Sequence, residues 1–373
     1  EVYGAQSAGA SAIYPLITEE FVPGSAEMDI KSGWLKDAGI YGLKSVSWFE
    51  ENGKAGLPAL LGTILIFDAK TGAPVGLLDG SHITGIRTGA AGAIGAKLLA
   101  RKHAKNLLIV GAGHVATFQA AATLLSFPGI EKVMVYDGLD YDNADRFVKN
   151  LRGTLAKDFG IEDVKAEFTA VKDIAEATGT SDIIITVTPS REPIIKKEWV
   201  KPGTHFSCIG SDMAGKEEID PEIFADAKVF TDDIEQCINV GEIEIPIKKG
   251  IMNRENISGI IGDIITGKAS GREDDEQITV FDATGTALLD LATGMLAIRE
   301  AKKLGTDNRI IESNKGECIM KLERFKVERW MDEYEGFLTY DLGETCIDSL
   351  EVGELLELCG KDPDAFLSGL KGE

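Results

Sequence analysis

The chain has 373 residues, of which 44% are hydrophobic and 27% charged, so it is long enough for two or three globular domains. Its net charge of −22 repels phosphate backbones and anionic lipid head groups, which argues against nucleic acid as a partner. The longest apolar runs have the length of a strand and any secretory signal is absent or already removed, so we expect no membrane association and a cytoplasmic protein.

The first half of the chain predicts a sheet and then a helix. Three β-type runs, GLKSVSWF, LGTILIFDA and PVGLLDG, lie between Gly42 and the turn after Asp79, separated by turn-rich segments. From His82 the sequence becomes rich in alanine and ends in basic residues, as expected near a helix C-terminus. We therefore expect a hairpin-rich sheet followed by a helix whose small side chains permit close packing.

An alternation of strands and helices follows. The segment NLLIVGAGHVATFQAAATLLSF combines an apolar strand, a glycine turn and an amphipathic helix, and KVMVYD is a second strand. The pattern continues with a helix near Tyr141–Phe159, a strand around Lys165–Phe168, and the apolar runs SDIIITVTP, THFSCIGSD and AKVFTDD. This alternation predicts an α/β fold with a doubly wound parallel sheet.

The last part of the chain changes character twice. After Asp263 the sequence predicts a short strand and a long helix, which we expect to return to the N-terminal domain. Beyond about Asp307 it becomes acidic and the alternation ends. We therefore predict three parts: a second α+β domain made of 1–104 with 281–308, a Rossmann domain at 105–280, and a separate acidic tail at 309–373.

A GxGxxA motif starts at Gly111, directly after a buried strand and at the start of a helix. Gly111 permits the tight turn, Gly113 lets the backbone approach a pyrophosphate, and the helix N-terminus at His114 and Val115 supplies unpaired N–H groups. Asp137 ends the next strand, where its carboxylate would bind the adenosine ribose and repel a 2′-phosphate. We predict NAD binding, with NADP less favoured; a tight turn without a ligand is the alternative, and His114 is expected to face solvent.

Two further loops follow predicted strands at the edge where Rossmann proteins bind their ligands. Thr186 and Thr188 either border the nicotinamide or are ordinary strand and turn residues. Asp212 and Lys216 lie in a loop beside the expected nicotinamide position. Asp212 either serves as a base or caps the following turn, and Lys216 either faces the cofactor or faces water.

Two basic residues of the first domain are candidates for substrate binding. Lys44 lies in a β-type run, where an inward-facing charge needs a partner, so it either lines a cleft or points outward. Arg87 is the first arginine of the chain and lies in the alanine-rich helix. A guanidinium among small residues suits bidentate binding of a carboxylate, with an ordinary structural ion pair as the alternative.

Metal and disulfide chemistry have little support in the sequence. The five cysteines form no CxxC pair and are odd in number, so we expect reduced thiols. The four histidines form no HxxH or HExxH pair, and we therefore predict no metal site.

Four ordered motifs resemble those of the ornithine cyclodeaminase/mu-crystallin family, which includes archaeal-type alanine dehydrogenases and ketimine reductases. They are the run from Gly56 to Arg101, then LLIVGAGHVA, GSDMAGKEEID and ITVFDATGTALLDLA, and the resemblance covers roughly Gly42 to Gly305. It implies a Rossmann domain inserted into a second α+β domain that binds the substrate and forms a homodimer.

The same resemblance implies roles for six residues. The family's catalytic lysine, carboxylate-binding arginine and base match Lys44, Arg87 and Asp212. Its cofactor-contacting threonine, loop lysine and ribose-binding acid match Thr88, Lys216 and Asp137.

Two features depart from the family pattern or extend beyond it. Members commonly carry a second substrate arginine near the N-terminus, but this chain has no arginine before Arg87, and Lys31 either replaces it or is a surface lysine. The segment from MKLERFKVERWMDEYE onward is similar to the opening of a class I aminotransferase-like chain, which would make the tail the start of a fusion partner.

The leading hypothesis is an ornithine cyclodeaminase-like lyase acting on a small L-amino acid. Hydride would leave Cα for NAD and later return, so that ornithine gives proline and ammonia without net oxidation. One alternative is an NAD(P)-dependent alanine dehydrogenase or cyclic ketimine reductase, which shares the first step. Another is a non-catalytic, mu-crystallin-like binding protein.

Overall fold

The computed structural model describes residues 1–305, 313–314 and 317–318. The chain divides into two compact units, 1–315 and 316–373. The predicted tail at 309–373, including the segment similar to an aminotransferase, lies outside the described residues apart from two short strands, β17 (Ser313–Asn314) and β18 (Glu317–Cys318). The domain boundaries predicted within the first unit stay predictions.

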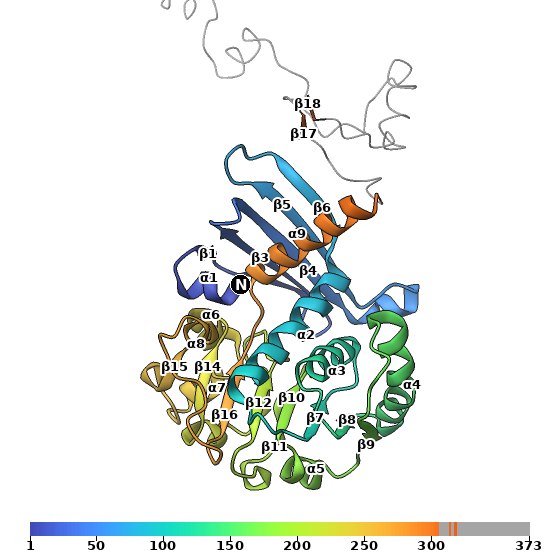
Figure 1. Ribbon diagram of the computed structural model, residues 1–373, viewed down its shortest axis with the longest axis vertical. Helices are drawn as coiled ribbons and strands as arrows, with labels where there is room; N and C mark the ends of the chain where they lie inside the picture. The colour runs from blue at the N-terminus through green and yellow to red at the C-terminus, as the bar shows by residue number, and fades with distance from the viewer. Residues whose placement is uncertain (306–312, 315–316, 319–373) are drawn as a thin grey trace, which may run out of the picture. The chain divides into compact units, whose positions relative to one another are not determined.

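The N-terminal residues form a six-stranded antiparallel sheet (Figure 1). Its order is β1-β3-β4-β5-β6, and β2 pairs with the half of β3 that β1 leaves free. Its last three strands confirm the predicted hairpin-rich sheet, whereas no strand was predicted before Gly42. The strands are β1 (Ser11–Ile13), β2 (Ile17–Val22), β3 (Ala26–Leu35), β4 (Ile40–Phe49), β5 (Leu60–Asp68) and β6 (Pro74–Asp79).

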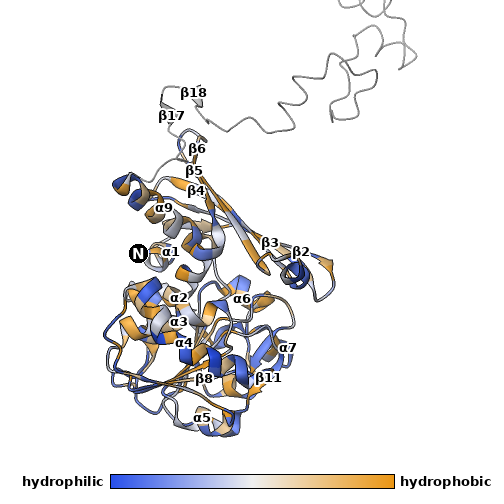
Figure 2. Ribbon diagram, turned by 90° about the vertical axis from the view of Figure 1, so that its right-hand side faces the viewer, coloured by the Kyte–Doolittle hydropathy of each residue, from blue (hydrophilic) through white to orange (hydrophobic). Residues whose placement is uncertain are grey.

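One face of this sheet is covered by the long helix α9 (Ala287–Leu304), as Figure 2 shows from the side. Ile64 and Ile66 of β5 are fully buried and belong to one hydrophobic cluster with Leu288 and Leu291 of α9. The helix therefore returns to the first sheet, as its position after the last predicted strand suggested. None of the described helices covers the opposite face of the sheet.

The middle of the chain forms an eight-stranded sheet whose neighbouring strands are all parallel, in the order β15-β14-β16-β12-β10-β7-β8-β9. Within this sheet β7 is the first strand in the sequence, and the strand order reverses between β7 and β10, so this is the doubly wound Rossmann fold. The strands are β7 (Asn106–Val110), β8 (Lys132–Tyr136), β9 (Glu167–Ala170), β10 (Ile183–Thr186), β12 (His205–Cys208), β14 (Lys228–Thr231), β15 (Ile257–Ile260) and β16 (Thr279–Asp282).

Helix α2 (Gly80–Leu99) links the two sheets and packs closely on the Rossmann part, because its small residues face large ones. A Cβ atom on Gly85 would lie 2.4 Å from the ring of Phe118, and one on Gly95 would lie 2.2 Å from the ring of Phe281. These contacts confirm the close packing predicted from the composition of the helix.

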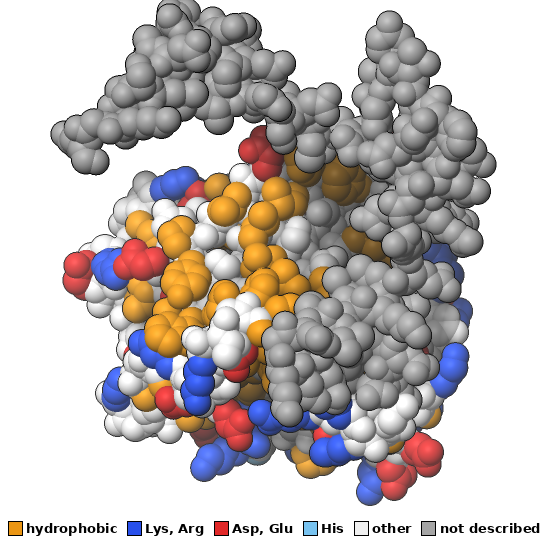
Figure 3. Space-filling view, turned by 90° about the horizontal axis from the view of Figure 1, so that it is seen from above, with side chains coloured by type: hydrophobic (Ala, Val, Ile, Leu, Met, Phe, Trp, Pro, Cys, Tyr) orange, Lys and Arg blue, Asp and Glu red, His pale blue; other side chains and the backbone are white. Residues whose placement is uncertain are grey.

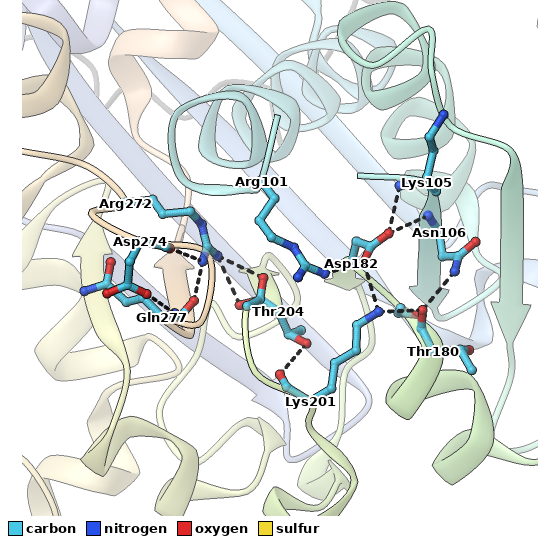
Figure 4. A network of polar contacts seen from close by, with 12 residues as sticks. Arg101, Lys105, Asn106, Thr180, Asp182, Lys201, Thr204, Arg272, Asp274 and Gln277 are labelled. Carbon is cyan, nitrogen blue, oxygen red and sulfur yellow. Dashed lines mark hydrogen bonds and ion pairs between the residues drawn. The ribbon is translucent and has the colours of Figure 1, made fainter. Parts of the chain in front are cut away.

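A polar network holds the amino ends of several parallel strands together, on the edge opposite the glycine turn (Figure 4). Asp182, just before β10, accepts hydrogen bonds from Arg101 Nη2 at 2.6 Å and Lys201 Nζ at 2.9 Å. It also accepts the backbone N–H groups of Lys105 and Asn106 at the start of β7. The carboxylate therefore joins β7, β10 and the turn before β12.

The remaining elements are short, except for α3 and α4. Helix α4 has the bounds predicted for it, and β9 starts two residues later than predicted. A small two-stranded parallel sheet, β11 (Arg191–Ile195) with β13 (Glu217–Ile219), was not predicted.

No described helix is long and apolar enough to cross a membrane. The helices are α1 (Val2–Ser7), α3 (His114–Ser126), α4 (Tyr141–Phe159), α5 (Ile174–Thr180), α6 (Ile234–Val240), α7 (Glu244–Lys248) and α8 (Ile261–Ile265), with 3₁₀ turns at Glu50–Ala55, Lys197–Trp199, Pro221–Ala225 and Arg254–Asn256.

Candidate active site

A cavity of about 360 Å³ is lined by the antiparallel sheet, helix α2 and loops at the carboxyl ends of the parallel strands. Both the first sheet and the Rossmann part contribute side chains, although these are far apart in the sequence. Eight of the residues predicted for the site line it: Lys31, Lys44, Arg87, Thr88, Val115, Thr188, Asp212 and Lys216.

Lys31 and Lys44 are register partners on the neighbouring strands β3 and β4. Since directly opposed residues share one face of a sheet, both ammonium groups point to the same side. Lys44 is 1% exposed and Lys31 5%, so neither is a surface lysine. Lys31 donates hydrogen bonds to the backbone carbonyls of Thr284, at 2.9 Å, and Gly285, at 3.3 Å.

Asp290 of α9 is the buried counter-ion of the basic cluster and was not predicted from the sequence. Its Oδ1 accepts Lys44 Nζ and Arg87 Nε, each at 3.0 Å, and its side chain is fully buried. Its Oδ2 has no hydrogen-bond partner among the described residues. A lone acid within the apolar run ALLDLATG was the available signal, because a buried charge needs a partner.

Arg87 both makes the structural ion pair and lines the cavity, so the two predicted alternatives are compatible. Its Nε donates a hydrogen bond to Asp290. Its guanidinium lies against the backbone at Gly285, where a Cβ atom would come within 2.2 Å of Nη1 and where φ is +79°. Gly285 therefore leaves the room that the guanidinium occupies.

The electrostatics of the basic cluster favour binding of an anion. Burial, together with the positive charges of Arg87 and Lys31, lowers the pKa of Lys44 to about 7, although Asp290 opposes this shift. Burial raises the pKa of Asp290, but Arg87 and Lys44 outweigh it and the pKa is lowered. The cluster of three cations and one carboxylate thus carries an excess positive charge that a substrate carboxylate can balance.

Asp212 and Lys216 form an ion pair with Nζ and Oδ1 2.6 Å apart. The Asp212 side chain is 43% exposed, whereas that of Lys216 is only 12% exposed, so Lys216 does not simply face water. Burial raises the pKa of Asp212, but Lys216 and Lys31 outweigh it, and the pKa lies below its ordinary value. Asp212 is therefore ionised at neutral pH and can accept a proton.

The glycine turn lies at the carboxyl end of β7 and opens α3. Gly111 has a φ of +109°, and a Cβ there would lie 2.9 Å from the carbonyl oxygen of Val187, so both conformation and space require glycine. Gly113 is the N-cap of α3 without a side-chain cap, and a Cβ on it would meet nothing within 4 Å. Val115 lines the cavity, whereas His114 is exposed, as predicted. The turn thus leaves room for a pyrophosphate beside the N-terminus of α3.

Asp137 follows β8, and its carboxylate is already oriented by its neighbours. Oδ1 accepts the N–H groups of Leu139 and Asp140, and Oδ2 accepts Asn143 Nδ2 at 2.8 Å. Burial raises the pKa of Asp137, but these hydrogen bonds outweigh it and the pKa is lowered. The group is therefore an ionised acceptor in the position expected for a ribose-binding acid.

Three threonines predicted to bind the cofactor differ in their surroundings. Thr88 is 8% exposed, lines the cavity, and its hydroxyl has no partner among the described residues. Thr188 also lines the cavity and donates to Glu218. Thr186 is fully buried, lies outside the residues lining the cavity, and donates to Glu218 at 2.7 Å. The hydroxyl of Thr186 is thus occupied by a buried acid.

The cavity also has an acidic side, which was not predicted from the sequence. Glu27 and Asp29 of β3 share a face with Lys31 and line the cavity, together with Trp48 of β4. Burial raises the pKa of both carboxyl groups. Alternate acidic residues in the run AEMDIK were the available signal. Among the described residues, no group of three or more His, Cys, Asp and Glu residues could hold a metal ion.

The model of the ornithine cyclodeaminase/mu-crystallin family matches residues 27–304. The chain belongs to this family. The resemblance inferred from the four motifs is thereby confirmed, and so is the Rossmann fold that it implied.

Three similar proteins are informative about this member of the ornithine cyclodeaminase/mu-crystallin family. Alanine dehydrogenase of Archaeoglobus fulgidus is 35% identical over 83% of this chain and 91% of its own length. The structure of Thermococcus litoralis Δ1-pyrroline-2-carboxylate reductase, in complex with NADH and L-proline, is 33% identical with a TM-score of 0.75, over 82% of this chain and 91% of that one. An archaeal alanine dehydrogenase dimer with bound NAD is 34% identical with a TM-score of 0.73, over 82% and 89%.

Proposed function

We propose that this chain is an NAD-dependent oxidoreductase that interconverts a small L-amino acid and the corresponding imine or oxo acid. The observation that carries the proposal is the convergence of Lys31, Lys44 and Arg87 on one cavity with Asp212 of the Rossmann part. NAD, when bound, supplies the nicotinamide ring that exchanges hydride with Cα. The bound NAD and NADH of the similar structures support this choice of cofactor.

Each charged side chain has a defined task in this proposal. Arg87 and Lys44, supported by Lys31, bind the substrate carboxylate and fix the orientation of the Cα–H bond. Asp212, ionised at neutral pH, accepts the proton from the α-amine. Lys216 holds Asp212 through an ion pair of 2.6 Å.

The residues of the chain fit the dinucleotide at three points. The open space beside Gly113 accommodates the pyrophosphate, and Asp137 accepts the ribose hydroxyls. The buried hydroxyl of Thr88, which has no partner among the described residues, gains one when a polar group enters the cavity. The negative charge of Asp137 favours NAD over NADP.

A net oxidoreductase now takes precedence over the lyase that led the sequence-based hypotheses. The alanine dehydrogenase and the cyclic-imine reductase, at 35% and 33% identity, both carry the name of a net oxidoreductase. The test is to incubate purified protein and NAD with L-alanine or L-proline, and NADH with pyruvate and ammonia or a cyclic imine, while NADH absorbance and ammonia are followed together. Net formation or consumption of NADH is expected. Turnover of none of these substrates would reject the proposal.

A specific observation keeps a cyclodeaminase as the second candidate. Glu27 and Asp29 place two carboxyl groups in the cavity, where the side-chain ammonium of a diamino acid such as ornithine would find a partner. This candidate requires that L-ornithine gives proline and ammonia without accumulation of NADH. Glu27→Gln should then weaken ornithine turnover more than alanine turnover; equal effects on both would exclude it.

We further propose that the protein is a homodimer that uses the open face of the antiparallel sheet. This face, on the side away from α9, exposes the apolar side chains of Trp34, Tyr41, Leu61 and Leu77, at 36%, 36%, 42% and 63%. Figure 3 shows hydrophobic side chains gathered on this side of the molecule. A large apolar patch on a sheet is typical of a protein interface, and the similar archaeal alanine dehydrogenase is a dimer.

A further inference from the structure

Glu218 of β13 is a buried acid to which the proposed chemistry gives no task. It is 0% exposed and does not line the cavity. It nevertheless lies directly behind two turns that do, the turn after β10 with Thr188 and the turn after β12 with Gly210.

The carboxylate of Glu218 joins these two turns through four hydrogen bonds. Oε1 accepts the backbone N–H of Thr188 at 2.6 Å and its hydroxyl at 2.8 Å. Oε2 accepts the backbone N–H of Gly210 at 2.9 Å and the hydroxyl of Thr186 at 2.7 Å. Since each oxygen accepts a backbone N–H group, which can only donate, both oxygens must be acceptors.

The backbone of Glu218 is itself held by the side chain of Glu242. The N–H groups of Glu218 and Ile219 both donate to Glu242 Oε1, each at 2.7 Å, and Glu242 is fully buried. At Gly210 a Cβ atom would lie 2.3 Å from the carbonyl oxygen of Thr188 and 2.6 Å from Glu218 Oε1, so the two turns touch at this point. Neither turn can move without breaking bonds to the same carboxylate.

We propose that Glu218 is a positioning residue that holds these two turns together and thereby shapes the part of the cavity that receives the nicotinamide. The proposal rests on the proposed function, because the carboxyl ends of β10 and β12 border the switch point where a Rossmann fold binds its ligand. It assigns Thr186 an indirect role: its hydroxyl orients Glu218 and does not contact the cofactor.

The test compares Glu218→Gln with Glu217→Gln in the full chain, using NADH fluorescence titration and thermal unfolding. In the glutamine side chain the oxygen can still accept one backbone N–H, but the NH2 group that replaces the other oxygen cannot, so one of the two turns loses its anchor. We expect the Kd for NADH to rise about tenfold. Glu217, which pairs with Lys249 at 3.5 Å and lies outside the cavity lining, is the matched control and should leave the Kd unchanged.

Each outcome decides the question. A lower Tm with an unchanged Kd for NADH would mean that Glu218 is only structural, and would overturn the proposal. If Glu218→Gln does not fold, Thr186→Val and Thr186→Ser replace it in the test. The valine removes one hydrogen bond to Glu218 and should weaken NADH binding, whereas the serine keeps the hydroxyl and should not. Equal affinities of the two variants for NADH would overturn the proposal. Failure of the wild-type protein to bind NADH would instead reject the proposed function.

Discussion

Among the individual residues of the site, Asp290 determines how the cations can coexist. Lys44 and Arg87 would repel each other inside the protein, but both donate to the same oxygen of Asp290. A buried pair of this kind contributes little to stability by itself, yet removal of one partner leaves an uncompensated charge. The arrangement keeps two positive groups fixed beside the cavity before the substrate carboxylate arrives.

The pKa of Lys44, about 7, predicts how carboxylate binding depends on pH. The ammonium form binds an anion, so affinity should be full below about pH 7 and should fall as the pH rises through this value. Propionate, which has no amino group, is a suitable probe of inhibition in the presence of NADH. Because Asp290 raises the pKa of Lys44, Asp290→Asn should move the loss of affinity to lower pH. An inhibition constant independent of pH in both proteins would contradict this account.

Substitution of Lys44 and Asp212 separates catalysis from cofactor binding. Lys44→Ala and Asp212→Asn should each lower kcat/KM on the order of 10²-fold or more, because the first removes a cation that binds the substrate carboxylate and the second removes the base. The Kd for NADH should change little, as measured by fluorescence titration, with the exposed Lys54→Ala as the control. Full turnover in both variants would show that neither residue takes part in catalysis, whereas NADH binding without any turnover by the wild-type protein would favour the non-catalytic binding protein considered from the sequence.

We expect the choice of dinucleotide to depend on Asp137. Its carboxylate, held ionised by Asn143 and two N–H groups, repels the 2′-phosphate of NADP. Asp137→Ala should therefore lower the ratio of kcat/KM for NAD to that for NADP by about tenfold or more. Asp145→Ala, which removes a half-buried carboxylate on α4, serves as the control. An unchanged ratio would show that another group selects the cofactor.

At the level of secondary structure, long segments with clear end signals could be predicted and short ones could not. Helix α4 lies where a helix near Tyr141–Phe159 was predicted, and its ends carry clear signals: Asp140 caps its N-terminus and Gly160 ends it in the left-handed conformation. β11 and β13 are short, and their pairing depends on contacts that bring distant loops together, which no local pattern reveals. Asp290 and Glu218 were missed for a related reason: their partners come from other elements.

The amino ends of the parallel strands should be sensitive to acid through Asp182. Burial raises the pKa of this carboxyl, but hydrogen bonds from Lys105, Lys201 and Asn106 outweigh it and give a pKa of about 2. Since the folded-state pKa lies below the unfolded value, the stabilisation is present above about pH 4 and is lost as the pH falls towards 2.

Asp182→Asn tests this link between strand ends and stability. It should lower the free energy of unfolding by about 2 kcal/mol at neutral pH, as measured by urea denaturation. The difference from the wild-type protein should shrink below about pH 4, where the wild-type carboxylate also loses its charge. Asp145→Asn, at a half-buried position on α4, is the control. An equal loss of stability at pH 3 and pH 7 would contradict the assignment.

At the level of the whole molecule, the antiparallel sheet has two unlike faces. One is buried beneath α9, and the other exposes a row of register partners, Trp34 with Tyr41 and Leu65 with Leu77, that no described helix covers. An apolar face of this kind is costly in water, so a second copy of the chain is the simplest cover. The cavity borders the same sheet, so that pairing of two sheets would also stabilise the strands that carry Lys31 and Lys44.

Leu77→Glu should therefore dissociate the proposed dimer. In a two-fold interface the substitution occurs on both subunits and places charges within an apolar contact, where they would be desolvated without partners. Size-exclusion chromatography with light scattering should show the wild-type protein as a dimer and the variant at half its mass. Leu125→Glu, on the 67% exposed Leu125 of α3, introduces the same charge away from the sheet and should stay dimeric. If the monomeric variant keeps NADH binding but loses affinity for propionate, dimer formation stabilises the half of the site formed by β3 and β4. A monomeric wild-type protein would exclude this interface.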